Sequence, residues 1–240
     1  MVRGLSRSTL VVSVIALVAT HLNAARPGEA TLAASPILER FLALGDPSPE
    51  SYRALRHLEA RNDKFNMSAW MDVWTESDAS GFHYRIEREE GSDYIRNRVF
   101  RESLETERKM WAAGAPDAAS LTPANYTFAE GGFQADGLAA LNIKPRRKDV
   151  LLIDGAIFLR PGDGELLKME GDLAKPPSFW TRHVRIVRHF QRFAGVRMPV
   201  SLDAVANVRW FGQSTFRAVY EYETVNAERV GTPQLRAASR

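Results

Sequence analysis

The residues of this chain best suited to chemistry are its histidines. His57 is predicted to lie on a helix between Arg56 and Leu58, where its side chain would be solvated. His183 and His189 fall on one predicted strand and share a face of it. The rise of a strand separates them by about 20 Å, which is too far for both to bind one metal ion. We therefore expect no metal site.

Acidic residues and sequence motifs give no better case for catalysis. Several aspartates precede glycine, as in Asp136-Gly137, Asp154-Gly155 and Asp163-Gly164, and this pairing is typical of turns. The chain contains no cysteine, which excludes thiol catalysis. The patterns H-E-x-x-H and G-x-S-x-G and the glycine-rich phosphate-binding motifs are absent. We predict no catalytic residue and no cofactor, and hence that the protein is not an enzyme.

Basic residues form two clusters that need an interpretation. The members are Lys144, Arg146, Arg147 and Lys148 in the first, and Arg182, Arg185, Arg188, Arg192 and Arg197 in the second. In a cytoplasmic protein such clusters would favour nucleic-acid binding. The export signal described next argues against that partner, and we predict none. A phospholipid head group, an acidic partner and a solvated face remain open for both clusters.

The first thirty residues have the layout of a secretory signal peptide. Arg3 and Arg7 provide a positive start, and residues 9–20 form an apolar stretch that is too short for a comfortable membrane span. Cleavage near Ala24 or Ala30 would leave a periplasmic protein that does not itself cross the membrane. The alternative is an uncleaved N-terminal anchor.

Composition indicates one ordinary domain after the signal. Without cysteine, the chain has no disulfide and no site for lipid attachment of the bacterial type, so its stability must come from a core. We expect a single domain over residues 31–226 and a frayed polar tail over residues 227–240. The formal net charge of +3 is mild and compatible with contact to anionic lipid surfaces.

Three helices are predicted from capping signals and spacing. Ser35-Pro36 starts the first, and Gly45 stops it. Ser48-Pro49 repeats the start signal, and we expect the following segment, with Tyr52, Leu55 and Leu58 on one side, to be a second amphipathic helix. A third is expected from about Asn97 to Ala113, ended by Gly114.

The rest of the chain alternates with the period of a strand. The alternation begins at Phe65, and Asp78 to Gly81 marks the turn of a hairpin. Further candidate strands cover residues 126–130, 138–144, 150–160, 166–174, 182–193, 196–211 and 214–225, separated by glycine and proline turns. The pattern predicts an α+β fold: a curved antiparallel sheet, or incomplete β-barrel, of about 9–11 strands, with helices packed on or in its concave face.

Several stretches resemble a group of exported bacterial proteins. These include EARNDKFNMSAWMDVWTE, PRRKDVLLIDGAIFL, LAKPPSFWTRHVRIVRHF and GVRMPVSLDAVANVRWFG. The group is labelled outer-membrane lipoprotein-sorting proteins, within the LolA-like superfamily, and the resemblance covers roughly Ile37 to Asn226. It implies a half barrel with helices in its mouth, whose concave apolar face holds acyl chains during transport through the periplasm for outer-membrane biogenesis.

We therefore expect a non-catalytic periplasmic carrier or binder of lipid or lipoprotein acyl chains. The side chains expected to line its cavity are Phe65, Met67, Met71, Phe82, Tyr84, Ile86, Met198, Val200, Val208, Trp210, Phe216 and Tyr220. The alternative is a sensing or interaction domain of the RseB/MucB type, which would bind a membrane-protein partner. A hydrolase is a third interpretation, which would require two close carboxylates or histidines at the cavity floor.

Overall fold

The structure is a computed structural model and describes residues 35–45, 47–112, 119–178, 181–210 and 212–235. The predicted signal peptide, both candidate cleavage sites and the helix end at Gly114 lie outside these residues.

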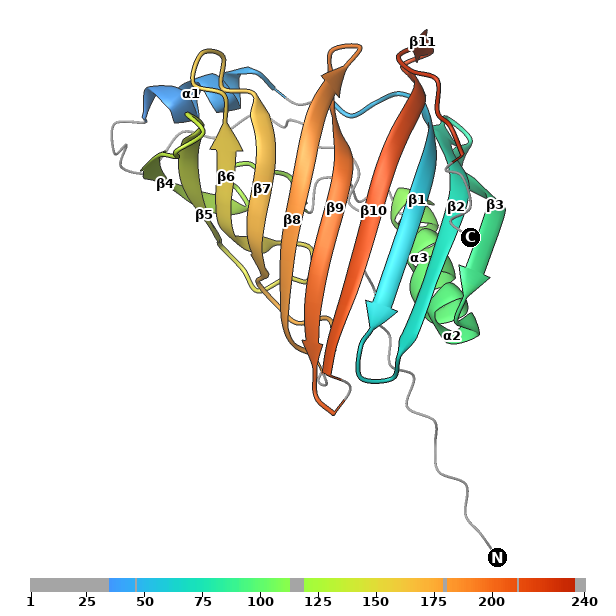
Figure 1. Cartoon of the computed structure of the whole chain (residues 1–240). Helices are drawn as coiled ribbons and strands as arrows, with labels where there is room; N and C mark the ends of the chain where they lie inside the picture. Colours follow the sequence, from blue (N-terminus) through green and yellow to red (C-terminus); the bar gives the residue numbers. More distant parts are fainter. Residues whose placement is uncertain (1–34, 46, 113–118, 179–180, 211, 236–240) are drawn as a thin grey trace, which may run out of the picture.

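Antiparallel strands form one large open sheet (Figure 1). Their order across the sheet is β3-β2-β1-β10-β9-β8-β7-β6-β5-β4, and a short β11 pairs with β10. The strands are β1 (Tyr52–Asn62), β2 (Met67–Asp78), β3 (Gly81–Gly91), β4 (Tyr126–Phe133), β5 (Ala139–Pro145), β6 (Ile153–Leu159), β7 (Leu166–Leu173), β8 (Thr181–Phe193), β9 (Val196–Val208), β10 (Gly212–Val225) and β11 (Glu228–Arg229). The sheet does not close on itself, since β3 and β4 are its edges within the described residues. The predicted fold class is confirmed.

One face of this sheet carries the core. Across the central strands, Ala218 on β10, Leu58 on β1 and Met71 on β2 are direct neighbours, and each is at most 3% exposed. Side chains of the same parity define what we call the inner face, and the opposite parity defines the outer face. The inner side chains of β1, β2, β6, β9 and β10 belong to one continuous apolar cluster.

Helices cover parts of the inner face. The first is α1 (Pro36–Ala43), whose buried Phe41 lies against Phe128 of β4. A longer helical segment follows β3 and consists of α2 (Asp93–Ile95), the π-helical η1 (Arg96–Arg101) and α3 (Glu102–Ala112). It begins four residues earlier than predicted, and its Phe100 packs on Phe216 of β10 with ring centroids 6.2 Å apart. Figure 1 shows α3 behind β1–β3.

The predicted second helix was wrong, because residues 52–62 form the central strand β1. Tyr52, Ala54, Leu58 and Ala60 do alternate along the inner face, but Arg56 occupies the middle position of the series. A charged residue at an inward position hides the period of 2, and the remaining apolar residues then match helical spacing. Residues 52–62 form a strand because they pair with β2, which follows in the chain, and with β10, which is distant in the chain.

The segment after Asn226 was expected to be frayed, but its described part is hydrogen-bonded. β11 pairs with β10, and the amide of Val230 donates to the carbonyl of Glu223 at 3.0 Å. In the described part of the chain, no helix is long and apolar enough to cross a membrane.

Candidate functional site

The structure places most of the predicted cavity residues on the inner face. Register assigns this face to Met67, Met71, Phe82, Tyr84, Ile86, Val208, Phe216 and Tyr220. Phe65 and Trp210 instead lie in turns at the lower end of the sheet, 46% and 68% exposed. Val200 lies at a register shift between β8 and β9, whereas Met198, beyond that shift, is 2% exposed and belongs to the apolar cluster.

A buried ion pair lies in the middle of the inner face. Arg56 of β1 and Glu107 of α3 form a two-pronged contact: Nη1 donates to Oε2 at 2.6 Å and Nη2 donates to Oε1 at 2.8 Å. The two side chains are 4% and 1% exposed. Nη2 of Arg56 also donates to the hydroxyl of Tyr52 at 2.8 Å, and that hydroxyl donates to Glu107 at 3.4 Å.

This contact connects the helical segment to the sheet. Burial alone disfavours the charged guanidinium, but Glu107 and Tyr52 outweigh it and raise the pKa of Arg56. The guanidinium also lies 4.9 Å from the ring centroid of Tyr220 and 5.4 Å from that of Phe82. If α3 moved away, Arg56 and Glu107 would each be left as a buried charge without compensation. The pair therefore holds α3 against β1.

A second buried guanidinium, that of Arg188, has no such partner. Arg188 lies on β8 opposite Leu202 of β9, has inner-face parity and is 6% exposed. Within the described residues it forms no ion pair and no hydrogen bond. Burial lowers the pKa of Arg188, while the electrostatic effects of Tyr220, Tyr126 and Glu107 oppose that shift. These residues come from β10, β4 and α3.

The tyrosines around the two arginines stay neutral at ordinary pH. Burial is the largest cause that raises the pKa of Tyr52, Tyr126, Tyr220 and Tyr222. Two arginines face one carboxylate, that of Glu107, among the members of this inner polar cluster, so the cluster has an excess of one positive charge. We use the name inner polar cluster for Arg56, Glu107, Arg188 and these four tyrosines.

The outer face holds a network around His57, which corrects the expectation of a solvated histidine. Its Nδ1 lies 2.6 Å from the buried carboxylate of Asp72, and its Nε2 lies 2.7 Å from Glu59. Arg88 donates to the other oxygen of Asp72 at 2.6 Å. A histidine beside an aspartate resembles half of a catalytic triad. Here, however, both ring nitrogens are bonded to carboxylates, so neither is available to activate a nucleophile in this arrangement.

His183 and His189 each have a polar partner on the outer face or at its edge. His183 of β8 pairs with Asp172 at 3.0 Å, and His189 contacts the hydroxyl of Ser201 at 3.1 Å. No group of three or more potential metal ligands occurs in the part of the chain that the structure describes.

Two hollows of the surface lie away from the inner polar cluster. One, of about 550 Å³, crosses the outer face between Trp70 of β2 and Arg217 of β10. The other, of about 870 Å³, lies at the lower end of the sheet beside Trp210.

Sequence reasoning singled out Arg188 in a basic cluster and Tyr220 as a cavity residue, but it missed the burial of Arg188 and the pair of Arg56 with Glu107, although one signal for them exists. Along β8 the inner series reads Val184, Ile186, Arg188, so a charged residue continues an apolar alternation. Arg56 interrupts the series of β1 in the same way. A lone arginine at an inward strand position is the pattern that points to a buried charge. Its pairing with Glu107, 51 residues away, is not visible locally.

Comparison with known proteins gives limited matches. No family model matches the sequence, and no curated protein matches it either. Among solved structures, the chain is similar to one described as a candidate outer membrane lipoprotein-sorting protein domain from Vibrio parahaemolyticus. The two share 12% identity over 78% of this chain and 91% of that one, with a TM-score of 0.42.

A second solved structure, a LolA superfamily protein from Nitrosomonas europaea, shares 9% identity over 77% of this chain and 90% of that one, with a TM-score of 0.35. The chain is thus similar to solved structures that carry the names of the group its sequence resembles, at a level that does not by itself indicate a function.

Proposed function

We propose that this protein is a non-catalytic periplasmic carrier or binder of lipids or lipoproteins, which takes up acyl chains at the inner face of its sheet. The observation that carries the proposal is Arg188, a buried cation of the inner face that forms no ion pair and no hydrogen bond with any described residue. A folded protein rarely keeps such a group unless something else completes it.

An acyl-chain amphiphile with an anionic head fits this environment. Its carboxylate or phosphate would pair with Arg188, and charge-assisted hydrogen bonds of this kind are among the stronger ones in proteins. Its hydrocarbon tail would lie along partly buried inner side chains such as Met67, Tyr84 and Ile86, which pack against the apolar cluster. Burying each methylene contributes about 0.8 kcal/mol. Tyr220, half-buried on the same face, adds a neutral hydroxyl near the head.

The direct test is recovery of cargo. The full chain is expressed in a bacterium, purified from the periplasm and examined by native mass spectrometry, followed by solvent extraction of bound lipid. We expect a co-purifying amphiphile and, after its removal, saturable uptake of a fluorescent fatty acid. Absence of both lipid and uptake would count decisively against a carrier, and a stoichiometric membrane protein in place of lipid would favour the sensing alternative.

Variants then test the role of Arg188. Arg188→Met should weaken binding of oleate by about tenfold or more, because a charge-assisted contact is lost, and should leave binding of uncharged oleyl alcohol unchanged. Arg185→Met is the matched control, since Arg185 lies on the same strand with outer-face parity and is exposed. Equal loss in both variants would contradict the assignment.

A further inference from the structure

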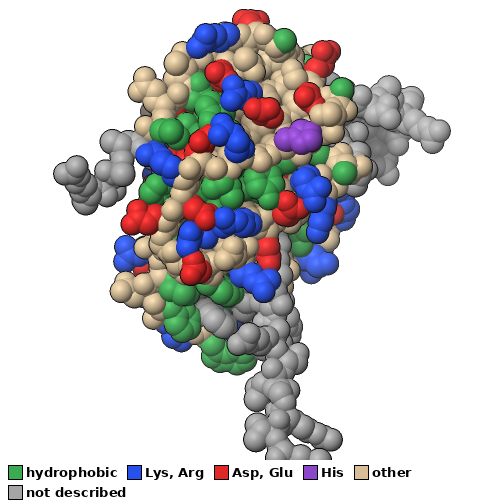
Figure 2. Space-filling model, turned by 90° about the vertical axis from the view of Figure 1, so that its right-hand side faces the viewer, with side chains coloured by type: hydrophobic (Ala, Val, Ile, Leu, Met, Phe, Trp, Pro, Cys, Tyr) green, Lys and Arg blue, Asp and Glu red, His purple; other side chains and the backbone are tan. Residues whose placement is uncertain are grey.

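The lower end of the sheet combines exposed aromatic residues with cations. The turn after β1 carries Lys64 and Phe65, the turn after β9 carries Arg209 and Trp210, and β8 begins nearby with Arg182. Phe65 and Trp210 are among the few large apolar side chains that the described surface exposes. Figure 2 shows hydrophobic side chains gathered at the lower end of the face it presents, below a surface of mixed charges. We call Lys64, Phe65, Arg182, Arg209 and Trp210 the lower tip.

The lower tip is a defined surface rather than a set of loose loops. The ammonium of Lys64 donates to the carbonyl of Trp210 and lies 5.9 Å from the ring centroid of Phe65. At the end of β1, above this turn, the side-chain amide of Asn62 donates to the hydroxyl of Ser214 at 2.8 Å. These contacts join the end of β1 to the start of β10. The hollow of about 870 Å³ is lined by Lys64, Arg182, His183, Arg209, Trp210 and Gln213 among others.

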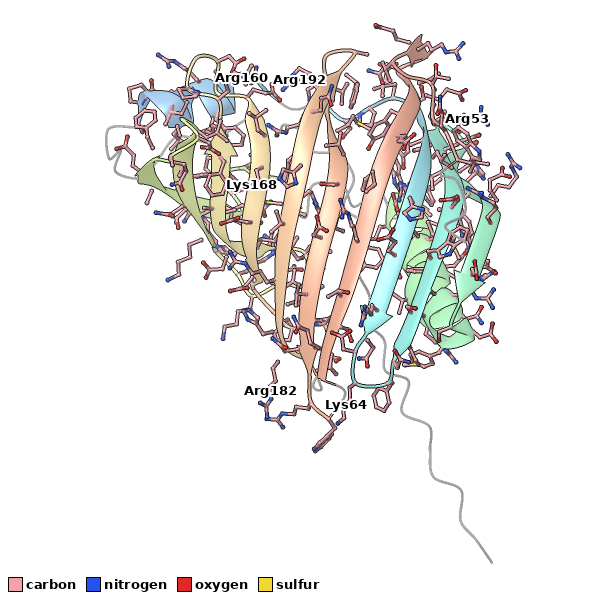
Figure 3. All side chains as sticks on the ribbon, viewed as in Figure 1. Arg53, Lys64, Arg160, Lys168, Arg182 and Arg192 are labelled. Carbon is pink, nitrogen blue, oxygen red and sulfur yellow. The ribbon has the colours of Figure 1, made fainter. Side chains whose placement is uncertain are left out.

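Charges at the two ends of the sheet differ in how they are paired. At the upper end, Arg53, Arg160 and Arg192 each form an ion pair, with Glu223 at 2.6 Å, Asp163 at 2.8 Å and Glu165 at 2.7 Å (Figure 3). At the lower end, neither Lys64 nor Arg182 forms an ion pair with any described residue. The neighbouring carboxylates are already engaged: Asp63 pairs with Arg61, and Asp172 pairs with His183.

Trp210 is held in an unusual backbone conformation. Its φ is 63°, a left-handed value that is costly for a large side chain. Its indole is 68% exposed, so burial of the ring offsets little of the cost of this backbone conformation. Such outliers are tolerated where the residue has a role other than packing.

We propose that the lower tip docks on the surface of a membrane that contains anionic phospholipids. Tryptophan and phenylalanine favour the interface between head groups and acyl chains, and nearby lysine and arginine are attracted to anionic head groups. Charge complementarity selects this occupant, because Lys64 and Arg182 form no ion pair with any described residue and lie near two exposed rings, and none of the five residues of the tip is a carboxylate. The inference stands apart from the proposed carrier function and concerns where the protein binds, not what it carries.

A site-specific fluorophore tests the proposal. The chain has no cysteine, so Gln213→Cys in the full chain provides one labelling position beside the tip, with Lys64, Phe65 and Trp210 intact. Labelling with an environment-sensitive dye reports on insertion. The matched control is Ala79→Cys, which places the same dye in the exposed β2–β3 turn at the opposite end of the sheet.

With vesicles of equal parts phosphatidylglycerol and phosphatidylcholine, we expect a blue shift of the dye at residue 213 and none at residue 79. Lys64→Gln and Arg182→Gln should each weaken vesicle binding about fivefold. Trp210→Ser should reduce the shift. The proposal is overturned if the dye at residue 213 does not shift, if both positions shift equally, or if vesicles of phosphatidylcholine alone give the same binding.

Discussion

Arg56 and Arg188 lie on the same face of one sheet, and both are at least 94% buried, yet their surroundings differ. Around Arg56, a carboxylate from α3 and a tyrosine hydroxyl occupy both terminal nitrogens of the guanidinium. Around Arg188, the electrostatic effects that oppose burial come mainly from tyrosines, and no described side chain bonds to it. We call the first half of the inner face, β1 with α3, complete because its buried cation has a carboxylate partner, although Nε of Arg56 forms no hydrogen bond within the described residues. The second half, around β8, is not.

The difference separates a structural use of charge from a use in binding. A buried pair is costly to desolvate, and much of that cost is recovered when both partners are present, so the Arg56–Glu107 contact fixes the helical segment. A single buried cation recovers little within the folded chain. Its contribution can become favourable only when an anion arrives, which is the condition that a binding site for an amphiphile would meet.

The largest effect is expected from breaking the complete half. Arg56→Met should lower the free energy of unfolding by about 3–5 kcal/mol, since Glu107 would remain as an unpaired buried carboxylate. Urea denaturation measures this loss. The double variant Arg56→Met with Glu107→Leu should regain most of it, because neither charge remains. A single variant that unfolds at the same urea concentration as the wild type would show that the pair is not held as described.

The tyrosines of the complete half should make the fold sensitive to alkali. Burial raises the pKa of Tyr52, so above about pH 10 the folded state retains a proton that the unfolded state releases. Stability is therefore present below that pH and falls as pH rises, by about 1.4 kcal/mol per pH unit for this residue. Urea unfolding of the wild type and of Tyr52→Phe is compared from pH 9 to 11.5. The difference between the two slopes isolates the contribution of Tyr52, because Arg188 and Arg197, whose pKa values are lowered by burial, are present in both proteins. Parallel slopes for the two proteins would contradict it.

In the half around β8, removing the buried arginine should change the free energy of unfolding in the opposite direction from Arg56→Met. Arg188→Met removes a buried charge and leaves no partner behind, so we expect the ligand-free protein to be unchanged or to gain about 1 kcal/mol of stability. Thermal and urea unfolding after removal of lipid provide the measurement. A loss comparable with that of Arg56→Met would mean that Arg188 is satisfied in the folded chain, and the contrast between the two halves would fail.

The smallest loss of stability is expected for a charge on α3 that is partly exposed, and it serves as the reference for the variants of the two buried arginines. Glu105 lies on α3, two residues before Glu107, and bonds to Arg108 and Tyr84 at 2.7 and 2.8 Å while partly exposed. Bonding to Arg108 and Tyr84 lowers the pKa of Glu105. Solvent screens such a pair, so Glu105→Gln should cost about 0.5 kcal/mol or less in urea unfolding. If Glu105→Gln lowered the free energy of unfolding as much as Arg56→Met, the loss would depend on the contact with α3 and not on the burial of the charge.

Much of the fold could be predicted because most of its strands show a local alternation of apolar and polar residues. From Leu202 to Val208 β9 alternates cleanly, and the turn between Asp78 and Gly81 joins β2 to β3 as expected. β1 could not be recognised, because Arg56 stands where an apolar side chain would complete the pattern. The same misplacement put His57 on a helix surface, whereas it lies in a network with Asp72.

The candidate site was less accessible to prediction, for a physical reason. Its parity was right for residues such as Met71 and Tyr220, since alternation alone determines which face a strand residue joins. The charges at its centre act through long-range partners, and spacing along the chain does not encode them. Phe65 and Trp210 were assigned to a cavity because they extend apolar alternations past the point where each strand ends.

The pairing of β1 with β10 has a kinetic consequence. The register joins Tyr52 to Val225, so the middle of the sheet is assembled from opposite ends of the described chain. Local hairpins such as β2–β3 can form early, whereas the central ladder requires closure of a very long loop, which slows folding. Until the last long strand arrives, β1 keeps an unpaired edge beside β2. We therefore expect refolding to be limited by this one contact, and chains shortened within β10 to remain aggregation-prone.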